Sequence, residues 1–440
     1  MAHPHPLVSQ ARRALSAAFA QLPIGSAVLL AISGGADSMA LAVSARYAAR
    51  ARAIELHSLT VDHGLRQESA HEARIVHERL TALGIAARVV RVHVGDASAG
   101  GAGQGPEGNA RLARYQALAD EALRLGRERG AQAVPVFLGH NADDQAETVL
   151  LGLARGSGAR SIAGMPRSGA LPEHSDVPMV RPLLDMRSEH LRTVCRELDV
   201  AWVEDPTNQL TSEWRAADGS SLRRSALRYR VIPLLEEILG AGVVPALVRT
   251  GEMAAADDAA LTQIARQALA ASVTISNTAM DNPTTPSTAA SSAAAPNAAT
   301  PNTAVLSAAA FTAAASTPTI SSAAIPTAAA PNTAALSTSA PTAAVPSAAT
   351  MPSAQQQRIQ ISCAQLAAYP QAVRTRSLRM AALSVGARQG ELFFSHISAL
   401  DKLVTGRENN IRIDLPGAHA IKRRGVLEIA QGRPPGAAPE

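Results

Sequence analysis

A glycine-containing segment at residues 33–38, SGGADS, carries residue types that would hold a polyphosphate. It follows an apolar run at 27–32 and precedes a helical pattern, so we expect it to form the turn between a buried strand and a helix. The glycines let the backbone approach an anion, while N–H groups at the helix start and the serine hydroxyls can bind phosphate oxygens. Asp37 would repel phosphate directly, which favours a role in holding the Mg²⁺ that neutralises it. By itself the segment is equally compatible with a tight turn capped by serine.

Two later segments place acidic side chains where other apolar runs end. VDHGLR occupies residues 61–66, and GHNADDQAET occupies residues 139–148. Asp144 and Glu147 are three residues apart on a predicted helix and therefore share one face. Acids that stabilise the helix dipole are the alternative, and Asp143 fits that alternative well. Two further acids facing one cleft favour a cationic guest, either a metal ion or an amine substrate.

Apolar runs alternate with helical patterns along the first half of the chain. The predicted strands are 27–32, 54–61, 86–94 and 134–139, and the predicted helices begin near 38, 68, 107 and 143. This alternation is typical of an α/β fold whose parallel sheet is covered by helices on both faces. Ligands of such sheets bind beyond the carboxyl ends of the strands, where all three polar segments fall. A further helix is expected at 187–198 and a short final strand at 200–203.

Composition divides the chain into parts. Residues 267–357 are dominated by Ala, Thr, Ser and Pro, with Asp281 as their only charged residue, so we expect disorder there. The predicted domains are a catalytic domain at 1–218, a helical linker at 219–266, the disordered insert at 267–357, the rest of a smaller C-terminal domain at 358–430 and a disordered tail at 431–440. We expect the C-terminal domain to be mostly helical, with a terminal β-hairpin.

Charge and cysteine content narrow the class of protein. The 440 residues include 41 Lys and Arg against 36 Asp and Glu, a balance that suits a phosphate-rich partner without requiring one. Cys195 and Cys363 are far apart, which predicts neither a disulfide framework nor a metal site built on paired cysteines. With no run of 18 apolar residues and no recognisable signal peptide, we expect a cytoplasmic enzyme without a membrane span.

Several segments resemble known proteins. SGGADS resembles the SGGxDS loop of the PP-loop ATP pyrophosphatase superfamily, which has an adenine-nucleotide α-hydrolase-like, Rossmann-type fold. It does not match the Walker pattern, which requires a lysine after the glycines. The joint order of SGGADS, VDHGLRxES, GHNADDQAET, RGSG…GM, RPLLDM and WVEDPTN resembles the tRNA(Ile)-lysidine synthetase family over about residues 27–235.

This resemblance implies a ligase that forms a C–N bond in two steps. ATP would first adenylate the C2 oxygen of cytidine 34 in the CAU anticodon of tRNA(Ile), with release of pyrophosphate. The side-chain amine of L-lysine would then attack C2 and release AMP, which leaves lysidine. The implied cofactors are ATP and Mg²⁺, and the implied partners are tRNA(Ile) and L-lysine, with a homodimer as a possible assembly.

The resemblance also implies roles for single residues. Asp37 would hold Mg²⁺, and Asp144 and Glu147 would bind lysine. The catalytic set would be Asp37, Arg111, Asp144 and Glu147. The nucleotide-binding set would be Ser33, Gly34, Gly35, Ala36, Asp37, Ser38, Asp62, His63 and Gly139.

A basic segment at 223–228, RRSALR, resembles a family pattern in which asparagine stands where this chain has Ser225. Arg224 and Arg228 share one face of the predicted helix and would reach tRNA phosphates, while a solvated basic helix is the alternative. His63 and His140 follow predicted strands, where each could contact nucleotide or serve as a hydrogen-bonded structural histidine.

Three other functions stay open. A tRNA-thiolating enzyme of the same superfamily generally needs paired or catalytic cysteines, which the two separated cysteines do not provide. A small-molecule synthetase of the superfamily would release pyrophosphate without RNA. A nucleotide- or RNA-binding module without catalysis is the third, and the presence of Asp37, Asp144 and Glu147 argues against it.

Overall fold

A six-stranded sheet forms the N-terminal half of the protein, in the order β3-β2-β1-β4-β6-β5. The computed structural model describes residues 3–64, 68–92, 105–155, 158–204, 223–273 and 358–432. The strands of this sheet are β1 (Ala27–Ala31), β2 (Glu55–Asp62), β3 (Ala86–Arg91), β4 (Val136–Leu138), β5 (Ser168–Leu171) and β6 (His174–Val180). All neighbouring pairs are parallel except β5 and β6, which confirms the predicted α/β class.

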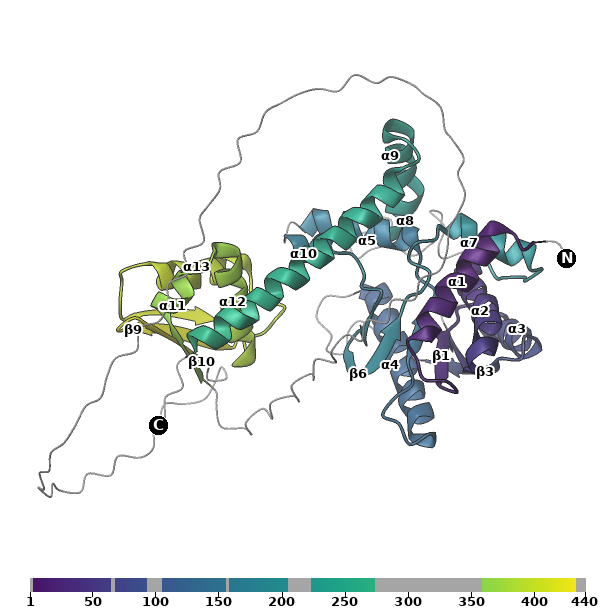
Figure 1. The fold of residues 1–440 in the computed structure, drawn as a ribbon, viewed down its shortest axis with the longest axis horizontal. Coiled ribbons are helices and arrows are strands. Elements are labelled where there is room, and N and C mark those ends of the chain that lie inside the picture. Colours follow the sequence, from purple (N-terminus) through teal and green to yellow (C-terminus); the bar gives the residue numbers. More distant parts are fainter. Residues whose placement is uncertain are drawn as a thin grey trace, which may run out of the picture. The chain divides into compact units, whose positions relative to one another are not determined.

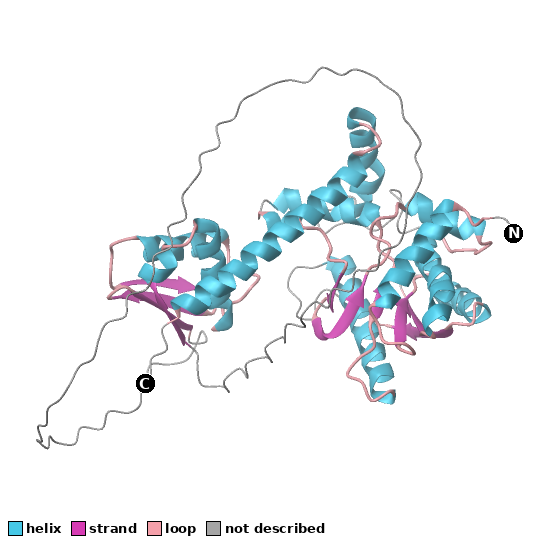
Figure 2. Ribbon diagram, in the orientation of Figure 1, coloured by secondary structure: helices cyan, strands magenta, loops and turns pink. Residues whose placement is uncertain are grey.

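Helices cover both faces of the sheet (Figures 1 and 2). They are α1 (Pro6–Ala20), α2 (Ala36–Ala49), α3 (Ser69–Ala82), α4 (Gly105–Glu128), α5 (Ala142–Arg155), α6 (Ala159–Ile162) and α7 (Ser188–Glu197). Because side chains alternate along a strand, Val28 and Leu30 of β1 join one core cluster with Phe19 of α1, whereas Leu29 joins a second cluster with Tyr115 of α4. Val28, Leu29 and Leu30 are fully buried, so β1 packs against helices on both faces of the sheet.

The predicted final strand at 200–203 is wrong. These residues form no strand, and the N–H of Val203 instead donates to the carbonyl of Gly34 at 2.9 Å. The edge of β4 that a further strand would need is occupied by β6, with Val136 opposite Met179. The β5–β6 hairpin was not predicted, because SGAL and HSDVPMV contain no continuous apolar run.

A bent helical segment follows: α8 (Arg223–Ala226), a π-helical turn (Leu227–Val231), α9 (Ile232–Leu239) and α10 (Val243–Ser272). Among the described residues no single helix is long and apolar enough to cross a membrane, although the pair Arg223–Leu239 and Val243–Ser272, bent by 101°, meets the length and composition criteria when taken together. Residues 267–272, which we expected in the disordered insert, belong to α10. Residues 274–357 of the insert lie outside the described residues.

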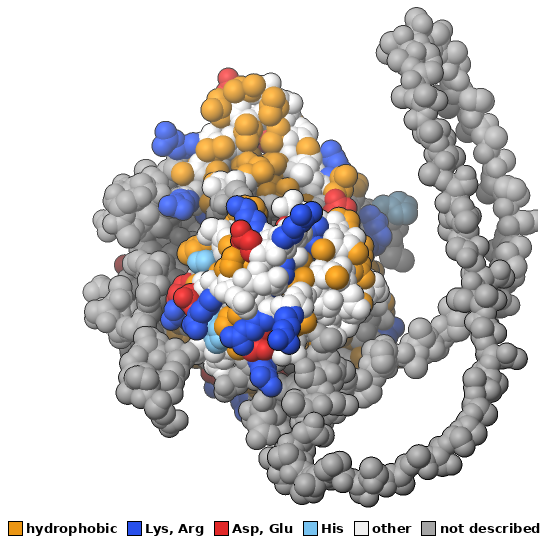
Figure 3. All heavy atoms as spheres, turned by 90° about the vertical axis from the view of Figure 1, so that its left-hand side faces the viewer, with side chains coloured by type: hydrophobic (Ala, Val, Ile, Leu, Met, Phe, Trp, Pro, Cys, Tyr) orange, Lys and Arg blue, Asp and Glu red, His pale blue; other side chains and the backbone are white. Residues whose placement is uncertain are grey.

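The C-terminal module contains a four-stranded antiparallel sheet in the order β7-β10-β9-β8. Its elements are β7 (Arg358–Ser362), α11 (Cys363–Ala367), α12 (Gln371–Ser384), α13 (Phe394–Thr405), β8 (Ile411–Leu415), β9 (Ala418–Arg423) and β10 (Val426–Gln431). The expected terminal hairpin is therefore part of a larger sheet, which β7 completes. Figure 3 shows Lys and Arg side chains gathered on one face of the molecule, with hydrophobic side chains between them.

Candidate active site

A cleft of about 520 Å³ opens at the carboxyl ends of β1, β2 and β4. The predicted site residues that line it are Ser33, Asp37, Ser38, Asp62, His63, Arg111, Gly139, Asp144, Glu147, Arg224 and Arg228. Gly34, Gly35 and Ala36 form the turn between β1 and α2 and are not among the lining residues. The structure thus brings segments from across the first 230 residues to one edge of the sheet.

The turn at residues 33–38 is held by its own serine hydroxyls. The Ser38 hydroxyl donates to the Gly35 carbonyl at 2.9 Å and accepts from the Gly34 N–H at 3.1 Å. Gly34 has φ +89, and a β-carbon there would lie 2.4 Å from Cγ2 of Val76, so both backbone shape and space require glycine. No side chain caps the start of α2, which leaves its first N–H groups directed toward the region that an anion would occupy.

Asp37 lies in the first turn of α2 and is mostly buried. Its Oδ1 accepts a hydrogen bond from the Ser188 hydroxyl at 2.9 Å, a contact that the sequence reasoning missed. Burial, and then the negative charge of Asp144, raise the pKa of Asp37 to about 6. Two carboxylates that oppose each other's ionisation favour a cation between or beside them.

These carboxylates fit Mg²⁺ if phosphate supplies the remaining ligands. Among the described residues no group of three or more His, Cys, Asp or Glu side chains could hold a metal ion alone. Mg²⁺ commonly binds one or two carboxylates together with substrate phosphates and water, so a site built on Asp37 needs no such group.

Asp144 and Glu147 form an ion-pair cluster with the basic helix. Arg228 donates from Nε to Glu147 at 2.7 Å and from Nη2 to Asp144 at 2.9 Å, and Arg224 Nη1 lies 3.4 Å from Glu147. The side chain of Glu147 is 0% exposed, and burial raises its pKa to about 7 despite Arg228. Arg224 and Arg228 are therefore about one-third exposed, at 34 and 36%, and both bind carboxylates of α5.

Asp143 has a structural role. Its carboxylate accepts hydrogen bonds from Nε of Arg187 and from the Ser188 N–H, both at 2.8 Å. Asn141 caps the start of α5, since its Oδ1 accepts from the N–H groups of Asp143 and Asp144 at 2.9 and 3.1 Å. These contacts fix the first turn of α5, and so the direction in which Asp144 and Glu147 point.

Asp62 and Arg111 line other parts of the cleft. Burial alone would raise the pKa of Asp62, but hydrogen bonds from the Ser69 hydroxyl and the Gly64 N–H hold it below its ordinary value. The guanidinium of Arg111 lies 5.0 Å from the ring centre of Tyr115. The side chain of Glu107 and residues 205–222, which include most of WVEDPTN, lie outside the described residues.

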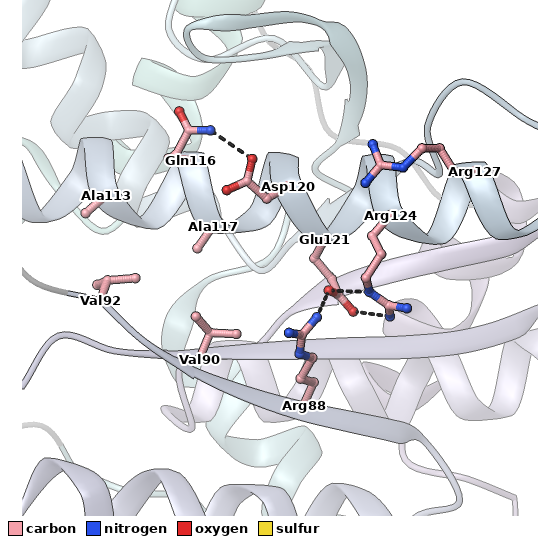
Figure 4. A pocket seen from close by; sticks show the side chains of 10 residues that line it. All are labelled: Arg88, Val90, Val92, Ala113, Gln116, Ala117, Asp120, Glu121, Arg124 and Arg127. Carbon is pink, nitrogen blue, oxygen red and sulfur yellow. Dashed lines mark hydrogen bonds and ion pairs between the residues drawn. The ribbon is translucent and has the colours of Figure 1, made fainter.

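A second hollow lies between β3 and α4 (Figure 4) and contains none of the predicted site residues. Its buried Glu121 pairs with Arg88 and Arg124, and Arg124 also pairs with Glu128. Within the hollow, Glu121 pairs with both of these arginines, so we assign the hollow no ligand.

Comparison with known proteins identifies relatives of the chain. A family model described as the PP-loop domain matches residues 7–235. The tRNA(Ile)-lysidine synthase of Streptomyces coelicolor is 35% identical over 414 residues, covering 93% of this chain and 87% of that protein. The tRNA(Ile)-lysidine synthase of Thermobifida fusca is 33% identical over 427 residues, covering 96% of this chain and 97% of that protein. The tRNA(Ile)-lysidine synthase of Salinispora arenicola is 41% identical over 265 residues, covering 60% of this chain and 73% of that protein.

Proposed function

Because the chain belongs to the tRNA(Ile)-lysidine synthase family, we propose that it ligates L-lysine to C2 of cytidine 34 in the CAU anticodon of tRNA(Ile), using ATP. In the first step the C2 oxygen attacks the α-phosphorus and pyrophosphate leaves. In the second step the side-chain amine of lysine attacks C2, AMP leaves with the oxygen, and the amine loses a proton. Adenylation is needed because the C2 oxygen of cytosine is otherwise a poor leaving group.

The turn at 33–38 binds the triphosphate in this proposal. The N–H groups at the start of α2 and the serine hydroxyls supply hydrogen bonds to phosphate oxygens. Asp37 holds Mg²⁺, which when bound neutralises charge on the phosphates. Arg111, which lines the same cleft, stabilises the negative charge that develops as pyrophosphate leaves.

Asp144 and Glu147 bind the ammonium group of lysine in this proposal. The support is that the pair already binds a cation, the guanidinium of Arg228, with bonds of 2.9 and 2.7 Å. A lysine ammonium would share or replace that guanidinium. The proposed contacts of Arg224 and Arg228 with tRNA phosphates likewise require these side chains to release Glu147.

One observation carries the proposal: the phosphate-binding turn, the acidic pair and Arg111 line a single cleft. The structure also argues against thiolation. Cys195 is buried, its Sγ donates to the Ala36 carbonyl, and burial raises its pKa to about 12, so it stays a protonated thiol. Cys363 lies in the C-terminal module and does not line the cleft.

The test is incorporation of radiolabelled lysine into RNA. Purified protein is incubated with ATP, Mg²⁺, labelled lysine and tRNA(Ile) carrying a CAU anticodon, with the same tRNA bearing uridine at position 34 as the matched control. We expect label only in the CAU tRNA, with AMP and pyrophosphate formed in equal amounts. Formation of ADP in place of AMP would contradict the proposal, and pyrophosphate release without tRNA would favour a small-molecule synthetase.

A homodimer and a cytoplasmic location belong to the same proposal. Helix α9 exposes Leu234, Ile238 and Leu239 by 53, 68 and 69%. A second copy of the chain would cover such a surface. Light scattering of the full chain distinguishes a dimer from a monomer.

A further inference from the structure

His140 lies on the segment that joins β4 to α5 and has no role in the function proposed so far. It follows β4 and lines the cleft, two residues beyond Leu138, which pairs with Ala31 of β1. Gly139 lies against the backbone of Asp37 and Ser38, since a β-carbon there would be 3.2 Å from both. His140 is thereby held close to the turn that we propose binds the triphosphate.

The hydrogen bond from Arg181 fixes the tautomer of His140, that is, which ring nitrogen carries the proton. Nε of Arg181 donates to Nδ1 of His140 at 3.0 Å, and Nη1 of the same arginine donates to the Pro166 carbonyl at 2.7 Å. A guanidinium can only donate hydrogen bonds, so Nδ1 must present its lone pair. In the neutral ring the proton is then on Nε2. Arg181 is 3% exposed, which makes this arrangement rigid.

The surroundings keep the ring neutral. Burial, and then the charges of Arg181, Arg114, Arg111 and Arg224, hold the pKa of His140 well below its ordinary value. A neutral His140 with Nδ1 blocked cannot act as a base through Nδ1 and is a poor proton donor. Its Nε2–H is a fixed hydrogen-bond donor instead.

Nε2 is the ring nitrogen of His140 that Arg181 leaves available, and His140 lines the cleft. Within the described ranges no protein atom pairs with it, and it is not among the buried polar atoms that lack a partner. Four arginines around the ring favour an anionic oxygen as the acceptor.

We propose that His140 is a catalytic residue that donates its Nε2–H bond to a non-bridging oxygen of the α-phosphate during attack on ATP, with Arg181 as the positioning residue that fixes the tautomer. The proton stays on Nε2 throughout. This inference rests on the proposed function and adds a donor to its first step. A donor aimed at charge that develops in the transition state lowers the barrier more than it tightens binding.

Two isosteric variants separate this role from a structural one. His140→Asn keeps an acceptor for Arg181, at the position of Nδ1, but has no donor at the position of Nε2. His140→Gln places an amide donor near the position of Nε2 but gives up the acceptor for Arg181. If His140 only holds Arg181 in place, His140→Asn should keep activity and His140→Gln should lose it. If the Nε2–H of His140 contacts phosphate, His140→Gln should keep activity and His140→Asn should lose it.

The experiment measures tRNA-dependent pyrophosphate release at varied ATP, together with the Tm of each protein. We expect kcat of His140→Asn to fall about 100-fold with KM for ATP changed less than 5-fold, and His140→Gln to stay within about 10-fold of the wild type. Activity of His140→Asn equal to that of the wild type, or equal losses in both variants at unchanged Tm, overturns the proposal. Lysine incorporation by the wild type is measured in parallel, and its absence would refute the proposed function. The comparison of pyrophosphate release by the two variants would still test the role of His140.

Discussion

Asp37 illustrates how a functional carboxyl can destabilise the fold. Burial and Asp144 raise its pKa from the ordinary value of 3.8 to about 6. The unfolded chain titrates near the ordinary value, so this group favours the folded state most below pH 4. That contribution is lost as the pH rises through about 6, because the folded protein must then hold a buried charge.

The variant Asp37→Asn is therefore expected to be more stable than the wild type at pH 8 without ATP or metal. The pKa shift corresponds to a gain on the order of 2–3 kcal/mol in the free energy of unfolding, and the gain should shrink at pH 5. Urea unfolding at both pH values measures it. The same variant and Asp37→Ala should lose lysine incorporation, and substantial residual incorporation would refute the metal assignment. A variant no more stable than the wild type at pH 8 would show that the buried charge is already compensated.

Glu147 tests the proposed lysine site at a second residue. The variant Glu147→Gln keeps the shape of a fully buried side chain and removes its charge. We expect KM for lysine to rise more than 10-fold at pH 8, where a group with a pKa of about 7 is ionised, while tRNA-dependent pyrophosphate release changes less. Glu236→Gln is the matched control, because Glu236 pairs with Arg187 at 2.9 Å and does not line the cleft. Equal effects of the two variants on KM for lysine would contradict the assignment.

At the scale of elements, the turn between β1 and α2 depends on one close contact. Gly34 and Gly25 both have left-handed backbones, with φ +89 and +78, so alanine is strained at either position. Only Gly34 would also bring a β-carbon within 2.4 Å of Val76, whereas nothing lies within 4 Å at Gly25. Gly34→Ala should therefore move the turn away from α3 and weaken ATP binding.

The comparison of Gly34→Ala with Gly25→Ala isolates that steric effect. Strain alone should cost each variant about 1 kcal/mol of stability. We expect KM for ATP to rise at least 10-fold only in Gly34→Ala, as measured by pyrophosphate release. Similar values of KM in both variants would show that α3 yields to the extra carbon.

The same elements show what sequence could and could not predict. The buried strand at 27–32 was predicted because its apolar run is continuous, and it is observed as Ala27–Ala31. The run at 200–203 has a similar apolar pattern but forms no strand, because β6 pairs with the edge of β4 that this strand would need. Which strand takes a sheet edge depends on contacts between distant segments, and local pattern does not contain that information.

For the site, too, local sequence pattern predicted some features, and contacts between distant segments determined the others. Residues at the carboxyl ends of β1, β2 and β4 were placed in one cleft by the topology of a parallel sheet alone. The pairing of Arg228 with Glu147 was not predicted, because it depends on how α8 and the π-helical turn pack against α5. The contact of Arg181 with His140 was not predicted for a related reason: RPLLDM, which begins at Arg181, follows β6, a strand that lacks an apolar run.

At the scale of the whole molecule, the low-complexity insert joins two points that lie close together. Val273, at the end of α10, forms an antiparallel bridge with Ile361 of β7. Arg358, the first residue of β7, is only three residues from Ile361 and therefore within about 11 Å of it. A short connection is thus sufficient to link the two elements.

Deletion of residues 275–350 should leave most lysine incorporation intact. Residues 274 and 351–357 remain after this deletion, and eight residues can span about 26 Å, more than the bridge requires. A shorter connection also has a slightly smaller entropic cost of loop closure, so the Tm should not fall. Loss of incorporation at an unchanged Tm would show that the insert takes part in the reaction or in binding tRNA.

A longer deletion, of residues 265–350, is the matched control because it cuts into α10. Ala265 and Ala268 are fully buried in the core of the C-terminal module, and the Ala265 carbonyl accepts a hydrogen bond from the Ser377 hydroxyl at 2.9 Å. Removing these last two turns of α10 exposes the core and leaves the buried hydroxyl of Ser377 with its helix partner Val373 alone. We expect a clear fall in Tm for this deletion only. If both deletions were equally harmless, the last two turns of α10 would not support the C-terminal module, and the low-complexity segment would functionally begin near residue 265.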